Sequence, residues 1–306
     1  MNTRLYRLNL SEEAMKTELG RFLLIFGIFS AFTAAAAPSA VVESVQAPAW
    51  VEHGGRRLAL LPGMQLDYSD RLVTGSGARA IVQLADGSAL KFGENASVGV
   101  NAMAARPDGL FTAALDVAKG AFRLTTDVFR KFQTRRAINV RTGTVTIGIR
   151  GTDVWGRAND EKDLVCLIEG RVSVTHPMAE ASAELSEPLQ FYVADKGKAP
   201  GPVASVEHSQ LAIWALETEL QHGVPTQRQG GRWALDFGLQ DKEAALALHD
   251  QLAGAGYGSR PLPERTGDSY RYRLRVGHLV SEADARLLVQ RLMQQLALET
   301  PPTIRR

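Results

Sequence analysis

The chain has 306 residues, of which 45% are hydrophobic and 22% charged, as is usual for a soluble globular protein. This composition excludes wholesale disorder, a collagen-like repeat and a polytopic membrane protein. The 35 basic and 33 acidic residues leave a formal charge of +2, too balanced to predict a nucleic-acid-binding protein. The length predicts about two domains. The single cysteine, Cys166, excludes an internal disulfide and a cysteine-based zinc site.

Residues 1–37 have the features of a secretory signal peptide. A segment with several basic residues precedes an apolar run, residues 22–37, that is shorter than the ~20 residues of a comfortable membrane span. Ala34 and Ala36 fit an A-x-A cleavage pattern before Ala37. An uncleaved membrane anchor and a buried core helix are the alternatives. Whether cleaved or anchored, an export segment would place the rest of the chain outside the cytoplasm.

Residues 45–175 predict an all-β domain. Short runs rich in Val, Ile and Thr end at turn signals about every ten residues, as in sandwiches and barrels. The run 80–84 is followed by Asp86-Gly87, a strong hairpin dipeptide, and the strand predicted at 110–117 ends at Lys119-Gly120. Cys166 lies in an apolar run, where we expect a buried and unreactive thiol. Residues 127–133 are expected to form one short helical turn.

Six segments of this region resemble the FecR domain, an all-β extracytoplasmic module. They are LVTG (72–75), LADGS (84–88), NAS (95–97), KGAF (119–122), IRGTDV (149–154) and IEGRV (168–172). The resemblance implies a contact with an envelope protein or a polysaccharide. In the best-known members, a FecR domain relays a signal across the inner membrane to a cytoplasmic anti-sigma segment, for which the stretch before Phe22 is short.

Residues 176–229 are expected to be a linker with one helix. Several prolines and glycines interrupt this stretch, and residues 190–193 are a candidate last strand of the first domain. Residues 206–222 have a helical pattern, with Leu211, Trp214 and Leu216 available for packing.

Residues 230–306 repeat a strand followed by a helix. The strand at 232–239 places Leu235 on one face, and the strand at 270–276 places Leu274 on one face. Further strands are expected at 257–262 and within 298–305. Asp241 and Ser281 are candidate N-caps of the two helices. The repeat predicts a small α+β domain whose helices cover one face of a single sheet.

This repeat resembles the SPOR domain. The matching segments are WALDFG (233–238), AA (244–245), Leu252, GY (256–257), YRLRVG (272–277) and EA (282–283). The resemblance implies a ferredoxin-like fold that binds peptidoglycan glycan strands, especially strands without stem peptides. That partner lies outside the cytoplasm, in agreement with an export segment.

Strand alternation identifies a candidate binding surface on the face opposite the helices. It places Asp236 there from the first strand and three arginines from the second. The candidate glycan-binding residues are Asp236, Arg271, Arg273, Arg275 and Tyr270, with Tyr257 as a second aromatic candidate at the sheet edge. The alternative is a solvated face with an internal Asp236–Arg273 pair. Members of the family often have Gln in place of Asp236, and some have an aromatic residue in place of Arg271.

No catalytic motif occurs in the sequence. The six histidines form no HxxH or HExxH pair, and there is no Walker loop, so we expect no catalytic residue, metal or cofactor. A basic cluster is expected to be a charged loop in water rather than a site for an anionic polymer; it consists of Arg130, Lys131, Arg135, Arg136 and Arg141.

The sequence therefore predicts a non-enzymatic periplasmic protein. Its SPOR-like domain would bind glycan strands and its FecR-like domain would make a second contact, with cell division as an associated process. It would touch the membrane only through an uncleaved N-terminal segment. The alternatives are a membrane-anchored FecR-type signal transducer that senses an envelope ligand and a cell-wall hydrolase.

Overall fold

The computed structural model describes residues 39–106, 108–126 and 135–306. The expected signal peptide or anchor (1–37), the helical turn expected at 127–133, and Arg130 and Lys131 all lie outside these ranges. Within them, no helix combines the length and the hydropathy of a membrane span.

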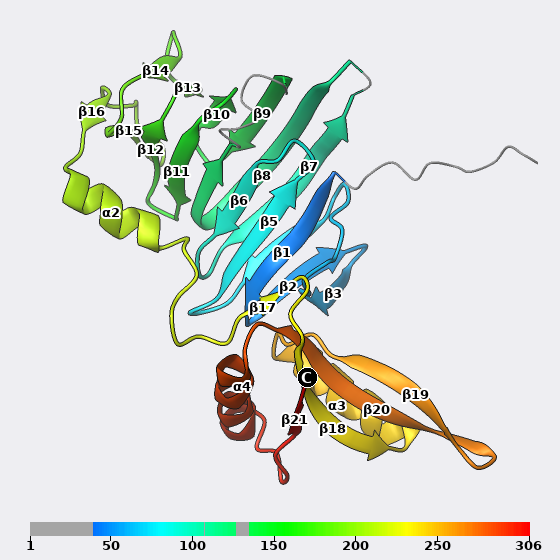
Figure 1. Cartoon of the computed structure of the whole chain (residues 1–306). Helices are drawn as coiled ribbons and strands as arrows, with labels where there is room; N and C mark the ends of the chain where they lie inside the picture. The colour runs from blue at the N-terminus through cyan, green and yellow to red at the C-terminus, as the bar shows by residue number, and fades with distance from the viewer. Residues whose placement is uncertain (1–38, 107, 127–134) are drawn as a thin grey trace, which may run out of the picture. The chain divides into compact units, whose positions relative to one another are not determined.

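The first part of the chain folds into two packed sheets, and the prediction of an all-β domain is confirmed (Figure 1). The first sheet contains, in spatial order, β1 (Ala40–Gln46), β5 (Arg79–Leu84), β6 (Ala89–Phe92), β8 (Leu110–Thr125), β11 (Asp153–Ala158), β12 (Lys162–Glu169), β15 (Gln190–Asp195) and β16 (Ala204–Ser205). The second contains β3 (Arg56–Ala59), β2 (Ala49–His53), β4 (Arg71–Thr74), β7 (Ser97–Ala105), β8 again, β9 (Arg135–Arg141), β10 (Thr146–Ile149), β13 (Val172–Thr175) and β14 (Ala183–Leu185). These pairings are antiparallel except for β8 with β9.

The long strand β8 belongs to both sheets. Its first part pairs with β7 and β9, and its last part, from Gly120 onward, pairs with β6 and β11. Gly120 has φ +95°, and a Cβ atom there would lie 2.4 Å from Ala96 Cα. The sequence predicted that the strand ends at Lys119-Gly120, but β8 continues through these residues to Thr125. This dipeptide bends the strand from one sheet into the other, which only glycine permits at this contact.

The core lies between the sheets because alternate side chains of each strand point inward. On β9, for example, Arg136, Ile138 and Val140 are buried, whereas Arg135 and Arg141 are exposed. Arg136 Nε lies 3.0 Å from Asp86 Oδ2, and the two side chains are almost completely buried. The expected basic loop is therefore wrong for these three arginines, since they belong to a strand and one of them is internal.

The sheets continue into the expected linker. β14 pairs with β13, β15 with β12 and β16 with β15, so paired strands extend to Ser205, beyond the expected domain boundary at residue 175. The candidate last strand at 190–193 is present as β15. Helix α2 (His208–Leu216) is shorter than predicted. Its Trp214 ring stacks on Trp155 at 5.0 Å between centroids, which packs the helix on the first sheet. The short strand β17 (Gln227–Arg228) follows.

The C-terminal domain has a ferredoxin-like order of elements (Figure 1). They are β18 (Trp233–Gln240), α3 (Lys242–Gly254), β19 (Arg260–Thr266), β20 (Ser269–Leu279), α4 (Glu282–Gln295) and β21 (Thr303–Arg305). The antiparallel sheet has the order β19-β20-β18-β21. Both predicted N-caps are present, because the Asp241 and Ser281 side chains accept hydrogen bonds from the backbone N–H groups of Ala244 and Asp284.

Both helices pack on one face of this sheet. Leu235 of β18 and Leu274 of β20 share a buried cluster with Leu252 of α3 and Leu288 of α4. Asp236 and Arg273 occupy the opposite side of the same strands, as alternation requires. The face that the sequence singled out is therefore the face without helices.

Candidate functional site

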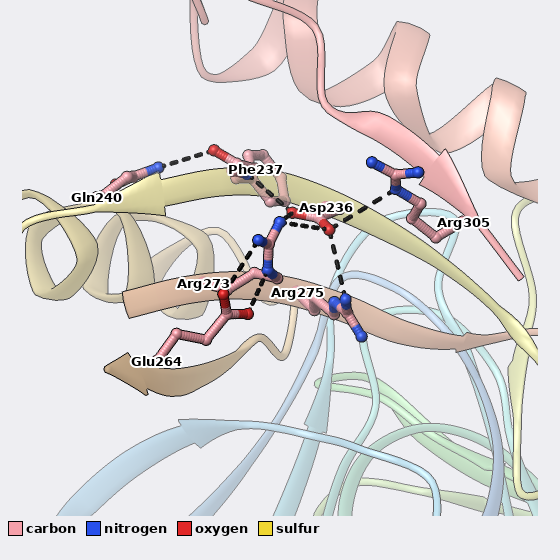
Figure 2. A network of polar contacts seen from close by, with 8 residues as sticks. Asp236, Phe237, Gln240, Glu264, Arg273, Arg275 and Arg305 are labelled. Atoms are coloured by element: carbon pink, nitrogen blue, oxygen red, sulfur yellow. Dashed lines mark hydrogen bonds and ion pairs between the residues drawn. The ribbon is translucent and has the colours of Figure 1, made fainter. Parts of the chain in front are cut away.

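Asp236 is the centre of a charged network on this face. Its side chain is 3% exposed and its Oδ2 atom lies 3.1 Å from Arg273 Nη1, 3.5 Å from Arg275 Nη2 and 3.9 Å from Arg305 Nε (Figure 2). The arginines come from β20 and β21, the two strands that flank β18. A single buried carboxylate thus holds three guanidinium groups together.

A bulge in β18 prepares Asp236 for this role. The register with β20 shifts between Asp236, which lies opposite Arg275, and Leu239, which lies opposite Arg273. Gly238, inside the bulge, has φ +78° and donates its backbone N–H to Asp236 Oδ1 at 2.9 Å. The bulge therefore supplies a hydrogen-bond donor that a regular strand would direct toward its neighbour.

Arg273 lies between two carboxylates. It contacts Asp236 on one side and forms a two-pronged pair with Glu264 of β19 on the other, through Nε–Oε1 at 2.5 Å and Nη2–Oε2 at 3.2 Å. The hydrogen bond that Arg273 donates to Glu264 is the main reason that the pKa of Arg273 is raised, and Asp236 adds to the effect. Paired contacts of this kind fix the plane of a guanidinium group.

The charges around Asp236 keep it ionised. Burial by itself would raise its pKa, but the Gly238 N–H and the Arg273 guanidinium outweigh burial and hold the pKa below its usual 3.8. The pKa of Glu264 is also lowered, chiefly by its hydrogen bond from Arg273. Both carboxylates are consequently negative at neutral pH and act as fixed anchors for the arginines.

We call Arg271, Arg273, Arg275 and Arg305 the arginine face. The side chains of Arg305 and Arg275 are 59% and 42% exposed, whereas that of Arg273 is 22% exposed. Arg271 is exposed and donates from Nη2 to the Leu239 carbonyl at 2.7 Å. Four guanidinium groups and two carboxylates, Asp236 and Glu264, leave 4 − 2 = 2 positive charges in excess. The surface offers hydrogen-bond donors and attracts acceptors, above all anionic ones.

The structure brings four of the five predicted site residues to one face. Asp236 is present there as a buried anchor and pairs with Arg273, the contact that the alternative of an internal pair described. Tyr270 is 62% exposed, but alternation along β20 places it on the side of Leu274, at the hairpin end beyond the helices. Tyr257 does not lie at the edge, because its ring is buried in the core and its Oη atom lies 3.0 Å from Gln295 Oε1.

Arg305 and Glu264 were missed by sequence reasoning. Each joins the network only because β21 pairs with β18 and β19 pairs with β20. No spacing pattern relates either residue to Asp236. The sheet order was the missing information.

Comparison with known families gives the class of each domain. The protein-family model described as "FecR protein" matches residues 70–173, and the family model of the SPOR domain matches residues 229–302. The chain therefore contains a FecR domain followed by a SPOR domain, which confirms both resemblances. Both are binding or regulatory domains that are typical of cell-envelope proteins.

Two similar solved structures are crystal structures of a "putative anti-sigma factor" from Parabacteroides distasonis ATCC 8503, at 2.50 Å and 1.65 Å resolution. The first is 13% identical and covers 76% of this chain and 97% of its own, with a TM-score of 0.38. The second is 14% identical and covers 77% of this chain and 98% of its own, also with a TM-score of 0.38. No curated protein matches the chain.

Proposed function

We propose that the protein is a non-enzymatic, exported cell-envelope protein that binds peptidoglycan glycan strands through the arginine face of its SPOR domain. The observation that carries the proposal is the open, positively charged face held in place by a buried carboxylate. The FecR domain makes a second contact, with another envelope component. Because peptidoglycan lies outside the cytoplasm, the proposal includes delivery to the periplasm by residues 1–37.

The chemistry of the arginine face suits a glycan strand. A guanidinium group only donates hydrogen bonds, and a glycan strand offers acetamide carbonyls, hydroxyl oxygens and the lactyl oxygens of its muramic acid units. Removal of the stem peptide converts each lactyl amide into a free carboxylate, which adds a negative charge opposite the excess positive charge. We therefore expect tighter binding to strands without stem peptides.

The buried network reduces the entropic cost of binding. Arg273 is held by Asp236 and Glu264, and Arg275 and Arg305 lie close to the same carboxylate. Side chains that are already ordered lose less rotamer freedom when a ligand arrives. Asp236 thus positions the arginines and does not itself need to reach the sugar.

Co-sedimentation of the purified full chain with isolated sacculi tests the proposal. We expect the protein to pellet with sacculi, and to do so more completely after an amidase has removed the stem peptides. The double variant R275Q/R305Q should pellet much less, because it removes the two exposed, charged donors nearest Asp236. The matched control K242Q/R286Q removes two exposed charges from α3 and α4 and should pellet like the original protein. Unchanged pelleting of folded R275Q/R305Q would contradict the proposal.

The signal-transducer alternative depends on a retained membrane link. N-terminal sequencing of the protein recovered from the cell envelope distinguishes the two functions. Cleavage before Ala37 supports the exported binding protein, and an intact N-terminus in the membrane fraction supports the transducer.

A further inference from the structure

A cavity of about 340 Å³ lies in the FecR domain where β8 bends from one sheet into the other. Lys119 of β8 and Arg157 of β11 line it, together with Arg79 at the start of β5. Glu217, which follows α2, and Glu94 in the turn after β6 complete its charged lining. The volume is at the lower end of the ~300–1,000 Å³ of small-molecule sites.

Arg79 is the unusual residue of this cavity. It is 4% exposed, and its Nη1 donates to the Ala78 carbonyl at 2.8 Å. Its Nε–H has no hydrogen-bond partner among the residues that the structure describes. Burial lowers the pKa of Arg79, while Glu94 and Glu217 act in the opposite direction. The Nε atom itself is covered by protein, so a ligand would meet the remainder of the guanidinium group. The incompletely paired positive charge of this buried group, at the wall of the cavity, favours an anion beside it.

The neighbouring charges leave room for one negative charge. Arg157 is already paired with Glu217, through Nε–Oε2 at 3.1 Å and a second contact between Nη2 and Oε1. Glu94 accepts a hydrogen bond from the Gly77 backbone. Lys119 is exposed, and within the described ranges it forms no ion pair. Three cations and two carboxylates give 3 − 2 = 1 positive charge in excess.

The rest of the lining is polar or small. Asn95 and Asn159 contribute amide groups that both donate and accept hydrogen bonds, and no aromatic side chain is among the described residues that line the cavity. A flat apolar ligand would find no stacking partner here. A small ligand with hydroxyl or amide groups and a single negative charge fits the lining better.

We propose that this cavity binds a small carboxylate, either a sugar acid or the carboxyl end of a short peptide, with Arg79 and Lys119 as the recognition groups. A dianion such as a phosphate monoester is less well matched, because Glu94 and Glu217 lie in the same lining and would repel a second negative charge. The inference does not depend on glycan binding by the SPOR domain, since none of its residues belongs to the arginine face.

Isothermal titration of the full chain with two matched pairs of probes tests this site. The first pair is N-acetylmuramic acid and N-acetylglucosamine, which differ by the lactyl carboxylate. The second pair is N-acetyl-alanyl-alanine and its C-terminal amide, of which only the acid carries a negative charge. We expect the acid of one pair to bind and its neutral analogue not to bind, and the pair that responds identifies the source of the carboxylate. Equal binding of acid and neutral probes, or no binding of any probe, would overturn the proposal.

Variants assign the binding to this cavity. K119A alters an exposed residue and should weaken binding of the acid severalfold without changing the melting temperature. R79Q should abolish binding, and its thermal melt shows whether the fold is retained. K198A removes another exposed lysine, which pairs with Asp195 away from the cavity, and should bind normally. Normal binding by K119A would place the ligand elsewhere, whatever the folding of R79Q. The titrations are repeated in R275Q/R305Q, which removes binding of the N-acetylmuramic acid carboxylate to the arginine face. The binding that remains is assigned to the cavity, so failure at one site is distinguishable from failure at the other.

Discussion

Asp236 and Arg305 belong to the first and last strands of the SPOR domain, yet Asp236 Oδ2 and Arg305 Nε lie 3.9 Å apart. The pairing of β21 with β18, which sets Asp236 opposite Thr303 and Ala234 opposite Arg305, brings them together. The charged network therefore links both ends of the domain. Its integrity should depend on the complete sheet, and the stability of the sheet should in turn depend on the network.

Replacing Asp236 should destabilise the SPOR domain. In D236N, three arginines lose their shared counter-charge. The amide has only one acceptor oxygen, so it cannot accept all the hydrogen bonds that the carboxylate accepts. We expect a loss of about 1–3 kcal/mol in the free energy of unfolding, measured by chemical denaturation. D250N, an exposed position on α3, should change stability by less than about 0.5 kcal/mol. Equal stabilities of the two variants would contradict the anchoring role.

The same carboxylate predicts how stability depends on pH. The folded-state pKa of Asp236 is lowered below its usual 3.8, so the unfolded chain binds the proton more readily than the folded one. The stabilisation is therefore complete above the unfolded pKa and is lost as the pH falls through the folded pKa. Denaturation measured over the acidic range should show a shallower pH dependence in D236N than in the original protein. Parallel curves would show that Asp236 is not the titrating group.

Cys166 should be unreactive in the folded protein. Its side chain is completely buried, and burial raises the pKa of the thiol to about 12. Because the thiolate is the reactive form, iodoacetamide should leave the native protein unlabelled at mildly alkaline pH and should label it after denaturation. Intact-mass spectrometry measures the label. Rapid labelling of the native protein would show that β12 opens or that the thiol is accessible.

Gly120 should be far less tolerant of substitution than a turn glycine. In G120A the new Cβ atom would meet Ala96 at 2.4 Å, and the φ of +95° is itself unfavourable for alanine. We expect a loss of more than about 3 kcal/mol in the free energy of unfolding. Gly109, with φ +77° and open space around its Cβ position, is the matched control, and G109A should cost only about 1 kcal/mol. Similar melting temperatures for both variants would contradict the bend at Gly120.

Sequence reasoning succeeded where the physical cause is local. Alternation along β18 and β20 placed Leu235 and Leu274 against the helices and Asp236 and Arg273 on the other face, because successive side chains in a strand point to opposite sides. The N-caps at Asp241 and Ser281 were predictable because each side chain binds a backbone N–H three residues away. The export segment rests on local composition as well, and it stays a prediction because residues 1–37 lie outside the described residues.

Only the tertiary structure decided which distant segments meet. Arg305 and Glu264 reach the network through strand pairing, and the predicted turn at Lys119-Gly120 proved to be a bend because β6 and β11 pair with the rest of β8. Tyr257 is buried because α4 packs over the sheet, and Arg79 shares a cavity with Glu217 because the chain returns to the FecR domain after α2. Strand order and packing depend on contacts between residues far apart in the chain, and a local pattern carries no information about them.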